Sequence, residues 1–155
     1  MVLRDDRVTL AHGGGGKAMR NLIEEVFTDV FEPPGMEDQA RLDAAALAEP
    51  GARLAFTTDS YVVTPVEFPG GDIGKIAVAG TVNDLAVGGA KPLWLSAAFI
   101  IEEGTEVSLL RRIVATMKAA DSHKGFAPPT ARSLTVPATA ILPISPPGNS
   151  TGVTT

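Results

Sequence analysis

The 155-residue chain contains no cysteine. This absence excludes disulfides, thiolate–metal sites and a cysteine nucleophile within the chain. Basic residues are outnumbered, because 13 Lys and Arg face 18 Asp and Glu and the net charge is −5. A sequence-independent nucleic-acid binder needs a basic surface to neutralise phosphates, so the charge argues against that class.

Long apolar runs are also missing. None reaches the roughly 18 residues that would cross a bilayer. Residues 1–7 include two aspartates and no apolar stretch, so they do not form a signal peptide. We therefore expect a cytoplasmic protein without membrane contact. The length suits one ordinary domain.

Composition changes sharply near residue 122. Residues 1–122 hold all 18 acidic residues and have a net charge of −7, whereas residues 123–155 have no Asp or Glu and six of the twelve prolines. We therefore predict a folded domain over 1–122 and a Pro/Thr/Ser-rich tail over 123–155. The tail is expected to be disordered or translated in a shifted reading frame, with at most a short edge strand at 134–136 or 140–142.

Hydrophobic periodicity in residues 1–122 predicts alternating strands and helices. The expected fold class is mixed α/β (α+β), with a mixed sheet covered by helices on one face. Strands are expected over residues 8–11, 53–63 and 92–101, the last one buried on both faces. Helices are expected over residues 19–30, over 73–87 with Asp72 as N-cap, and after Gly104.

A glycine run separates the first expected strand from the first expected helix. It comprises Gly13, Gly14, Gly15 and Gly16, and Lys17 follows it. Glycines let a backbone approach a ligand closely, and a helix N-terminus suits phosphate. The run is not a Walker A loop, because Ala11 stands where the first glycine should be and Ala18 where Ser or Thr should bind Mg²⁺. A phosphate-binding loop and a loop without ligand both remain open.

Asp59 is the second candidate. It lies in an otherwise apolar expected strand beside Thr57, Thr58 and Ser60. Mg²⁺ prefers carboxylate oxygens combined with substrate phosphate, so this cluster suits a metal–phosphate site. The alternative is a surface residue of an alternating strand.

Asp84 is the third candidate, and Asn83 precedes it. On a helix, Asp84 falls on the same face as Ile73, Ala77 and Gly80, which is the face of small, apolar residues. A carboxylate on a buried face marks a site candidate, with an internal N-cap or a buried hydrogen bond as the alternative.

Five segments together resemble the HypE family. They are LAHGGGGKAM (10–19), EDQARLD (37–43), FTTDSYVV (56–63), FPGGDIGK (68–75) and AGTVNDLAVGGAKP (79–92). The family comprises the carbamoyl dehydratases of [NiFe]-hydrogenase maturation. It belongs to the superfamily of aminoimidazole ribonucleotide synthetase, selenophosphate synthetase and thiamine monophosphate kinase.

The resemblance implies a fold like the N-terminal domain of aminoimidazole ribonucleotide synthetase. It implies a homodimer that binds ATP and Mg²⁺ near an inter-subunit sheet. Asp59 and Asp84 match the positions that hold Mg-ATP, Asn83 adjoins the second, and Gly13–Lys17 match the segment near the nucleotide phosphates. The family uses ATP to dehydrate a thiocarboxamide on its own C-terminal cysteine to a thiocyanate, the source of the iron cyanide ligands.

The resemblance also implies partners, namely the carbamoyltransferase HypF and the HypC–HypD complex. Compared with the family, the chain is expected to be truncated, without the C-terminal domain, the GDTK-type motif or the terminal cysteine. We therefore expect no catalytic residue in it and no dehydration by it alone. Two other functions remain open. One is a non-catalytic dimerising or regulatory module, and the other is a selenophosphate synthetase-like member of the superfamily.

Overall fold

The computed structural model describes residues 6–31, 53–123 and 142–144, with the backbone alone at 121–123 and 142–144. The helical elements are a 3₁₀ helix Leu10–Gly13, α1 Lys17–Leu22, a π-helical segment Ile23–Thr28, α2 Asp29–Phe31, α3 Ile73–Val87 and α4 Val107–His123. The strands are β1 Glu67–Phe68, β2 Gly71–Asp72, β3 Ile100–Glu102 and β4 Leu142–Ile144. The EDQARLD segment (37–43), one of the five that resemble the HypE family, lies outside the described residues.

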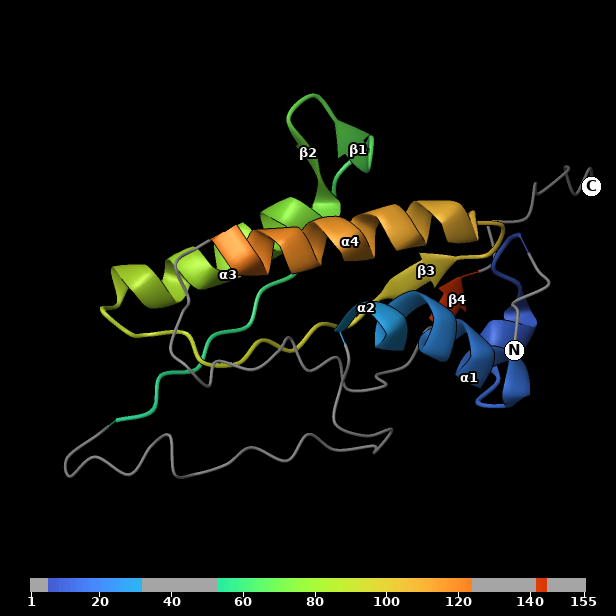
Figure 1. The fold of residues 1–155 in the computed structure, drawn as a ribbon, viewed down its shortest axis with the longest axis horizontal. Coiled ribbons are helices and arrows are strands. Elements are labelled where there is room, and N and C mark those ends of the chain that lie inside the picture. The colour runs from blue at the N-terminus through green and yellow to red at the C-terminus, as the bar shows by residue number, and fades with distance from the viewer. Residues whose placement is uncertain (1–5, 32–52, 124–141, 145–155) are drawn as a thin grey trace, which may run out of the picture.

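The described elements form a mixed α/β structure (Figure 1). Helices α3 and α4 lie against each other, and α4 also packs on the continuous helical rod Lys17–Phe31. An antiparallel hairpin, β1–β2, projects from the start of α3, with Glu67 opposite Asp72. Parallel strands β3 and β4 pair from Ile100–Leu142 to Glu102–Ile144.

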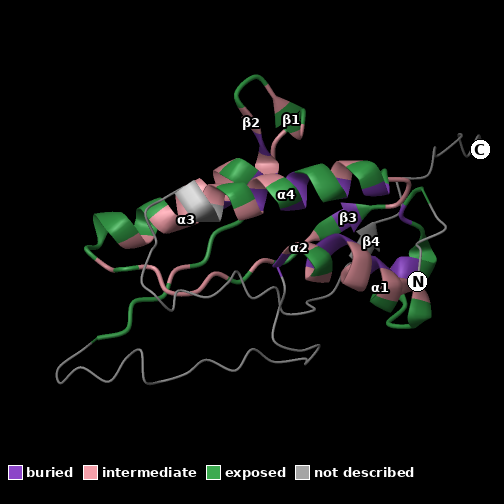
Figure 2. Ribbon diagram, viewed as in Figure 1, coloured by how far each residue is buried: buried purple, intermediate pink, exposed green. Residues whose placement is uncertain are grey.

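The hydrophobic core lies between the rod and α4 (Figure 2). The rod contributes Leu22, Val26, Phe27 and Phe31, and α4 contributes Val107, Leu110, Val114 and Met117. These sets recur at helical spacing, as the periodicity predicts, so each helix buries one stripe. Both expected helices are confirmed, and the first runs slightly beyond its predicted ends.

Helix α3 begins where the sequence predicts. The Asp72 side chain accepts a hydrogen bond from the Lys75 amide at 2.9 Å, which is the N-cap interaction. The same carboxylate is buried and accepts a hydrogen bond from the Thr116 hydroxyl on α4, 2.6 Å from its Oδ2. Asp72 therefore starts α3 and also joins it to α4.

The predicted strand at 8–11 is wrong. Residues 7 and 8 pair with residues 104–106, just before α4, through an Arg7–Glu106 bridge and two hydrogen bonds between Val8 and residues 104–105. The chain then turns into the 3₁₀ helix, because the Thr9 amide donates to Nδ1 of buried His12 at 3.0 Å. This local side-chain bond competes with strand pairing.

The other two predicted strands are mostly wrong. Residues 53–63 run as an extended chain but belong to no strand, and of 92–101 only Ile100 and Ile101 lie in β3. A strand needs a hydrogen-bonded neighbour, and extended propensity alone does not supply one. The expectation of burial on both faces of 92–101 is also wrong, because Ile100 is 71% exposed.

The predicted tail is described only at the backbone of His123, which ends α4, and of β4, which starts at Leu142, where the second predicted edge strand ended. The predicted disorder or frame shift of the rest lies outside the described residues. In the described part of the chain, no helix is both long and apolar enough to cross a membrane.

Candidate functional site

The candidate site lies along the second half of α3. Asn83 and Asp84 are exposed near its C-terminal end. Lys75 is also exposed, but it lies at the other end of the helix. The prediction that Asp84 sits on a buried face is wrong. The buried face of α3 is formed by Gly74 and Val78, which face α4, so the Asp84 carboxylate is left accessible to ligands.

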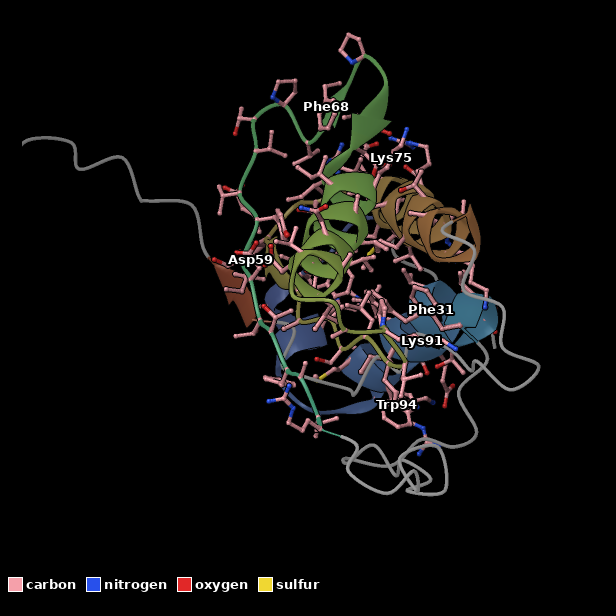
Figure 3. The ribbon with its side chains drawn as sticks, turned by 90° about the vertical axis from the view of Figure 1, so that its left-hand side faces the viewer. Phe31, Asp59, Phe68, Lys75, Lys91 and Trp94 are labelled. Atoms are coloured by element: carbon pink, nitrogen blue, oxygen red, sulfur yellow. The ribbon has the colours of Figure 1, made fainter. Side chains whose placement is uncertain are left out.

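The extended segment 53–63 runs beside α3 and brings Asp59 next to it (Figure 3). Asp59 is exposed, and its Oδ1 accepts a hydrogen bond from the Ser60 amide at 2.8 Å. An exposed carboxylate agrees with the alternative of a surface-facing residue, and it also leaves the group accessible to a cation.

Tyr61 is the contact between this segment and α3, and the sequence analysis missed it. Its hydroxyl lies 3.5 Å from that of Thr81. A Cβ atom built on Gly80 would approach the Tyr61 ring at 2.9 Å, so glycine at this position allows the ring to lie on the helix. The available signal was the single tyrosine of the chain, two residues after Asp59.

Both candidate carboxylates act on this phenol. Burial is the largest cause that raises the pKa of Tyr61 above 10.0, and the hydrogen bond with Thr81 partly offsets this rise. The negative charges of Asp59 and Asp84 also raise this pKa. Tyr61 follows Asp59 by two residues and contacts Gly80, one turn before Asp84 on α3, so the structure brings the two segments that carry Asp59 and Asp84 together.

The glycine run does not join this group within the chain. Gly13 ends the 3₁₀ helix, Gly16 caps α1 and Lys17 begins it. Gly14, Gly15, Gly16 and Lys17 are exposed, and Gly15 has a φ of 72° that favours glycine. Along the long axis in Figure 1, this loop lies at the opposite end from the C-terminal end of α3.

The metal-ligating possibilities are narrow. In the described ranges, no group of three or more His, Cys, Asp and Glu side chains could hold a metal ion. A protein-only cage is therefore absent from that part of the chain. Two carboxylates are still the donor set that Mg²⁺ uses when substrate phosphates and water complete its coordination, so Asp59 and Asp84 fit a nucleotide-bound magnesium.

The comparisons with known proteins define the class first. The family model described as "AIR synthase related protein, N-terminal domain" matches residues 41–127. The match covers more than half of the chain, and the chain belongs to this family. The range includes Asp59, Asn83 and Asp84 and leaves out the glycine run.

Individual proteins within this family show a more specific similarity, to HypE. Over 117 residues the chain is 91% identical to "Carbamoyl dehydratase HypE" of Rhodobacter capsulatus, covering 76% of this chain and 34% of that protein. It is 50% identical to "Carbamoyl dehydratase HypE" of Escherichia coli K12 over 125 residues, covering 79% and 37%. The chain therefore spans about a third of the length of these relatives.

Comparison with solved structures also finds HypE proteins. E. coli HypE matches with a TM-score of 0.68 and 42% identity, over 82% of this chain and 38% of that one. A second structure, hydrogenase maturation protein HypE in complex with ATP, matches with a TM-score of 0.57 and 35% identity, over 88% and 36%. The predicted resemblance to HypE and the predicted domain type are confirmed.

Proposed function

We propose that the described domain binds ATP together with Mg²⁺, with Asp59 and Asp84 holding the metal and Asn83 beside them. The observation that carries this proposal is the contact of Tyr61 with Gly80 and Thr81, which brings the segment of Asp59 against the helix that carries Asp84. Both groups are exposed, so a metal–nucleotide complex can reach them. The similar HypE structure in complex with ATP supports the choice of nucleotide.

The activity that follows for the whole protein is carbamoyl dehydration in [NiFe]-hydrogenase maturation. In that reaction ATP drives the loss of water from a cysteine thiocarboxamide, and the thiocyanate formed supplies iron cyanide ligands. HypF and the HypC–HypD complex are the proposed partners, in the cytoplasm. These 155 residues contain no cysteine. We therefore assign nucleotide binding to them, and not the dehydration itself.

Self-association is the second part of the proposal. Leu54, Phe56 and Val62 are 72%, 84% and 95% exposed on the extended segment 53–63. Exposed apolar groups on a segment that pairs with no strand of the described residues favour pairing with another copy. A homodimer also offers a way for Gly13–Gly16 and Lys17 to approach a nucleotide held by Asp59 and Asp84 of a second copy. Light scattering tests this part, and a strict monomer at micromolar concentration would contradict it.

The test of nucleotide binding compares carboxylate substitutions by isothermal titration calorimetry with ATP and Mg²⁺. Asp59→Asn and Asp84→Asn each remove one charged oxygen ligand with little change in shape. A charged contact contributes about 1.5–3 kcal/mol, so each variant should bind ATP about 10- to 100-fold more weakly.

Asp29→Asn is the matched control, because Asp29 is an exposed carboxylate on α2 and makes the same chemical change away from the site. ATP affinity should be unchanged in this variant. If the unmodified chain binds no ATP, or if all three substitutions have equal effects, the proposed site is wrong.

A further inference from the structure

Tyr61 occupies a site on α3 that only a glycine leaves open. A Cβ atom on Gly80 would meet Cε1 of the Tyr61 ring at 3.1 Å and Cζ at 2.9 Å, and it would lie closer still to the hydroxyl oxygen. Distances under 3.0 Å, such as the one to Cζ, are ones that real Cβ atoms essentially never show. The hydroxyl end of the ring therefore lies against the helix backbone at Gly80, and its hydroxyl reaches Thr81, 3.5 Å away.

This contact is placed between the two candidate carboxylates. Asp59 and Tyr61 are two residues apart on an extended chain, so their side chains leave it on the same side. Gly80 and Asp84 are four residues apart on α3, so they share one face of the helix.

The chain direction brings the two carboxylates to the same end. The segment 53–63 approaches along α3 from the C-terminal end of the helix, and α3 then runs back in the opposite direction (Figure 1). The step from Tyr61 to Asp59 along the segment therefore points the same way as the step from Gly80 to Asp84 along α3.

We infer that Tyr61 is a positioning residue for the proposed nucleotide–magnesium site, and that its packing on Gly80 sets the separation between Asp59 and Asp84. The inference rests on the proposed function. Tyr61 itself touches neither metal nor nucleotide in this arrangement. It fixes how close to α3 the segment 53–63 lies, and a binding site works only when its groups are held within about 0.5 Å.

The experiment uses the absence of any other tyrosine in the chain. Incorporated 3-fluorotyrosine gives a single ¹⁹F resonance that reports the environment of the ring without nucleotide. The functional measurement is the Mg²⁺ concentration at which half of a fixed amount of ATP is bound. Circular dichroism and thermal unfolding check that each variant folds.

Gly80→Ala should shift the ¹⁹F resonance and raise the Mg²⁺ midpoint about tenfold, because the new methyl group displaces the ring. Tyr61→Ala should raise the midpoint by a similar factor, whereas Tyr61→Phe retains the ring and should change it less than threefold. Adding Gly80→Ala to Tyr61→Ala should have no further effect, since the clash needs the ring. Gly88→Ala is the matched control at the C-cap of the same helix, where the added methyl group would meet the Leu85 carbonyl oxygen at an ordinary 3.5 Å.

The outcomes separate the two ideas. If Gly80→Ala and Tyr61→Ala leave the Mg²⁺ midpoint unchanged while Asp59→Asn and Asp84→Asn raise it, the positioning role is wrong and the proposed site stands. An unshifted ¹⁹F resonance in Gly80→Ala also overturns the inference. If neither carboxylate substitution affects ATP binding, the proposed site fails, and the inference fails with it.

Discussion

Gly74→Ala is expected to destabilise the domain, although the same change usually stabilises a helix. Gly74 is buried in the first turn of α3, where that helix lies against α4. A Cβ atom there would come within 2.6 Å of the Ile113 carbonyl oxygen and 2.7 Å of Cγ of Met117. The Met117 side chain can rotate away, but the Ile113 carbonyl belongs to the backbone of α4 and cannot.

Two opposing terms decide whether Gly74→Ala raises or lowers the free energy of unfolding. Alanine is favoured over glycine inside a helix by about 1 kcal/mol. Forcing an extra carbon into a well-packed contact costs about 1–3 kcal/mol, and more when backbone must move. Because the closest atom is a backbone oxygen, we take the upper part of that range. The net loss in the free energy of unfolding is then about 2 kcal/mol, which lowers the melting temperature by about 4–8 °C.

The assay is urea unfolding followed by circular dichroism, with Gly88→Ala as control. Gly88 caps the same helix at a φ of −75°, and a methyl group there meets only ordinary contacts. The control should therefore be neutral or slightly stabilising. A Gly74→Ala variant as stable as the Gly88→Ala variant would refute the claim that α3 and α4 touch closely at this position.

Two more substitutions test how α4 holds its neighbours. Thr116→Val removes the hydroxyl that donates to buried Asp72, which should reduce the free energy of unfolding by about 1.5–3 kcal/mol. Thr116→Ser retains this hydroxyl and should retain most of the free energy of unfolding. Arg112→Gln should raise the pKa of Glu67 back toward 4.5, because a side-chain hydrogen bond and the charge of Arg112 now lower it. The Arg112–Glu67 pair stabilises the fold above the ordinary pKa of Glu67 and loses this effect as the pH falls through the lowered pKa. An NMR titration that gives the same Glu67 pKa in the unmodified protein and in Arg112→Gln would contradict the assignment.

Helices were predictable from this sequence because their signals are local. Asp72 provides a cap for α3, and the apolar residues of the rod and α4 repeat at the helical period. Asp59 and Asp84 could also be selected as site candidates from their unusual places in apolar segments. The separate extended and helical segments that carry them do come together in the structure, through the contact of Tyr61 with Gly80 and Thr81.

Strands were harder because their partners are not local. Residues 53–63 have the composition of a strand, but no described neighbour pairs with them. The short stretch 8–11 has an apolar pattern too, yet the bond between Thr9 and His12 turns it into a 3₁₀ helix. The exposure of Asp84 could not be predicted either, because it depends on which face of α3 meets α4.

The small residues of α3 explain why the sequence pattern misled on that last point. Gly74 and Gly80 are six residues apart, which places them about 120° apart around the helix. Gly74 admits the backbone of α4, whereas Gly80 admits the ring of Tyr61. A helix approached closely on two faces needs small side chains on both, so it shows no single apolar stripe that points to the core. The face that carries Asp84 is small because a neighbouring segment lies on it, and the carboxylate at its end remains open to solvent and to a ligand.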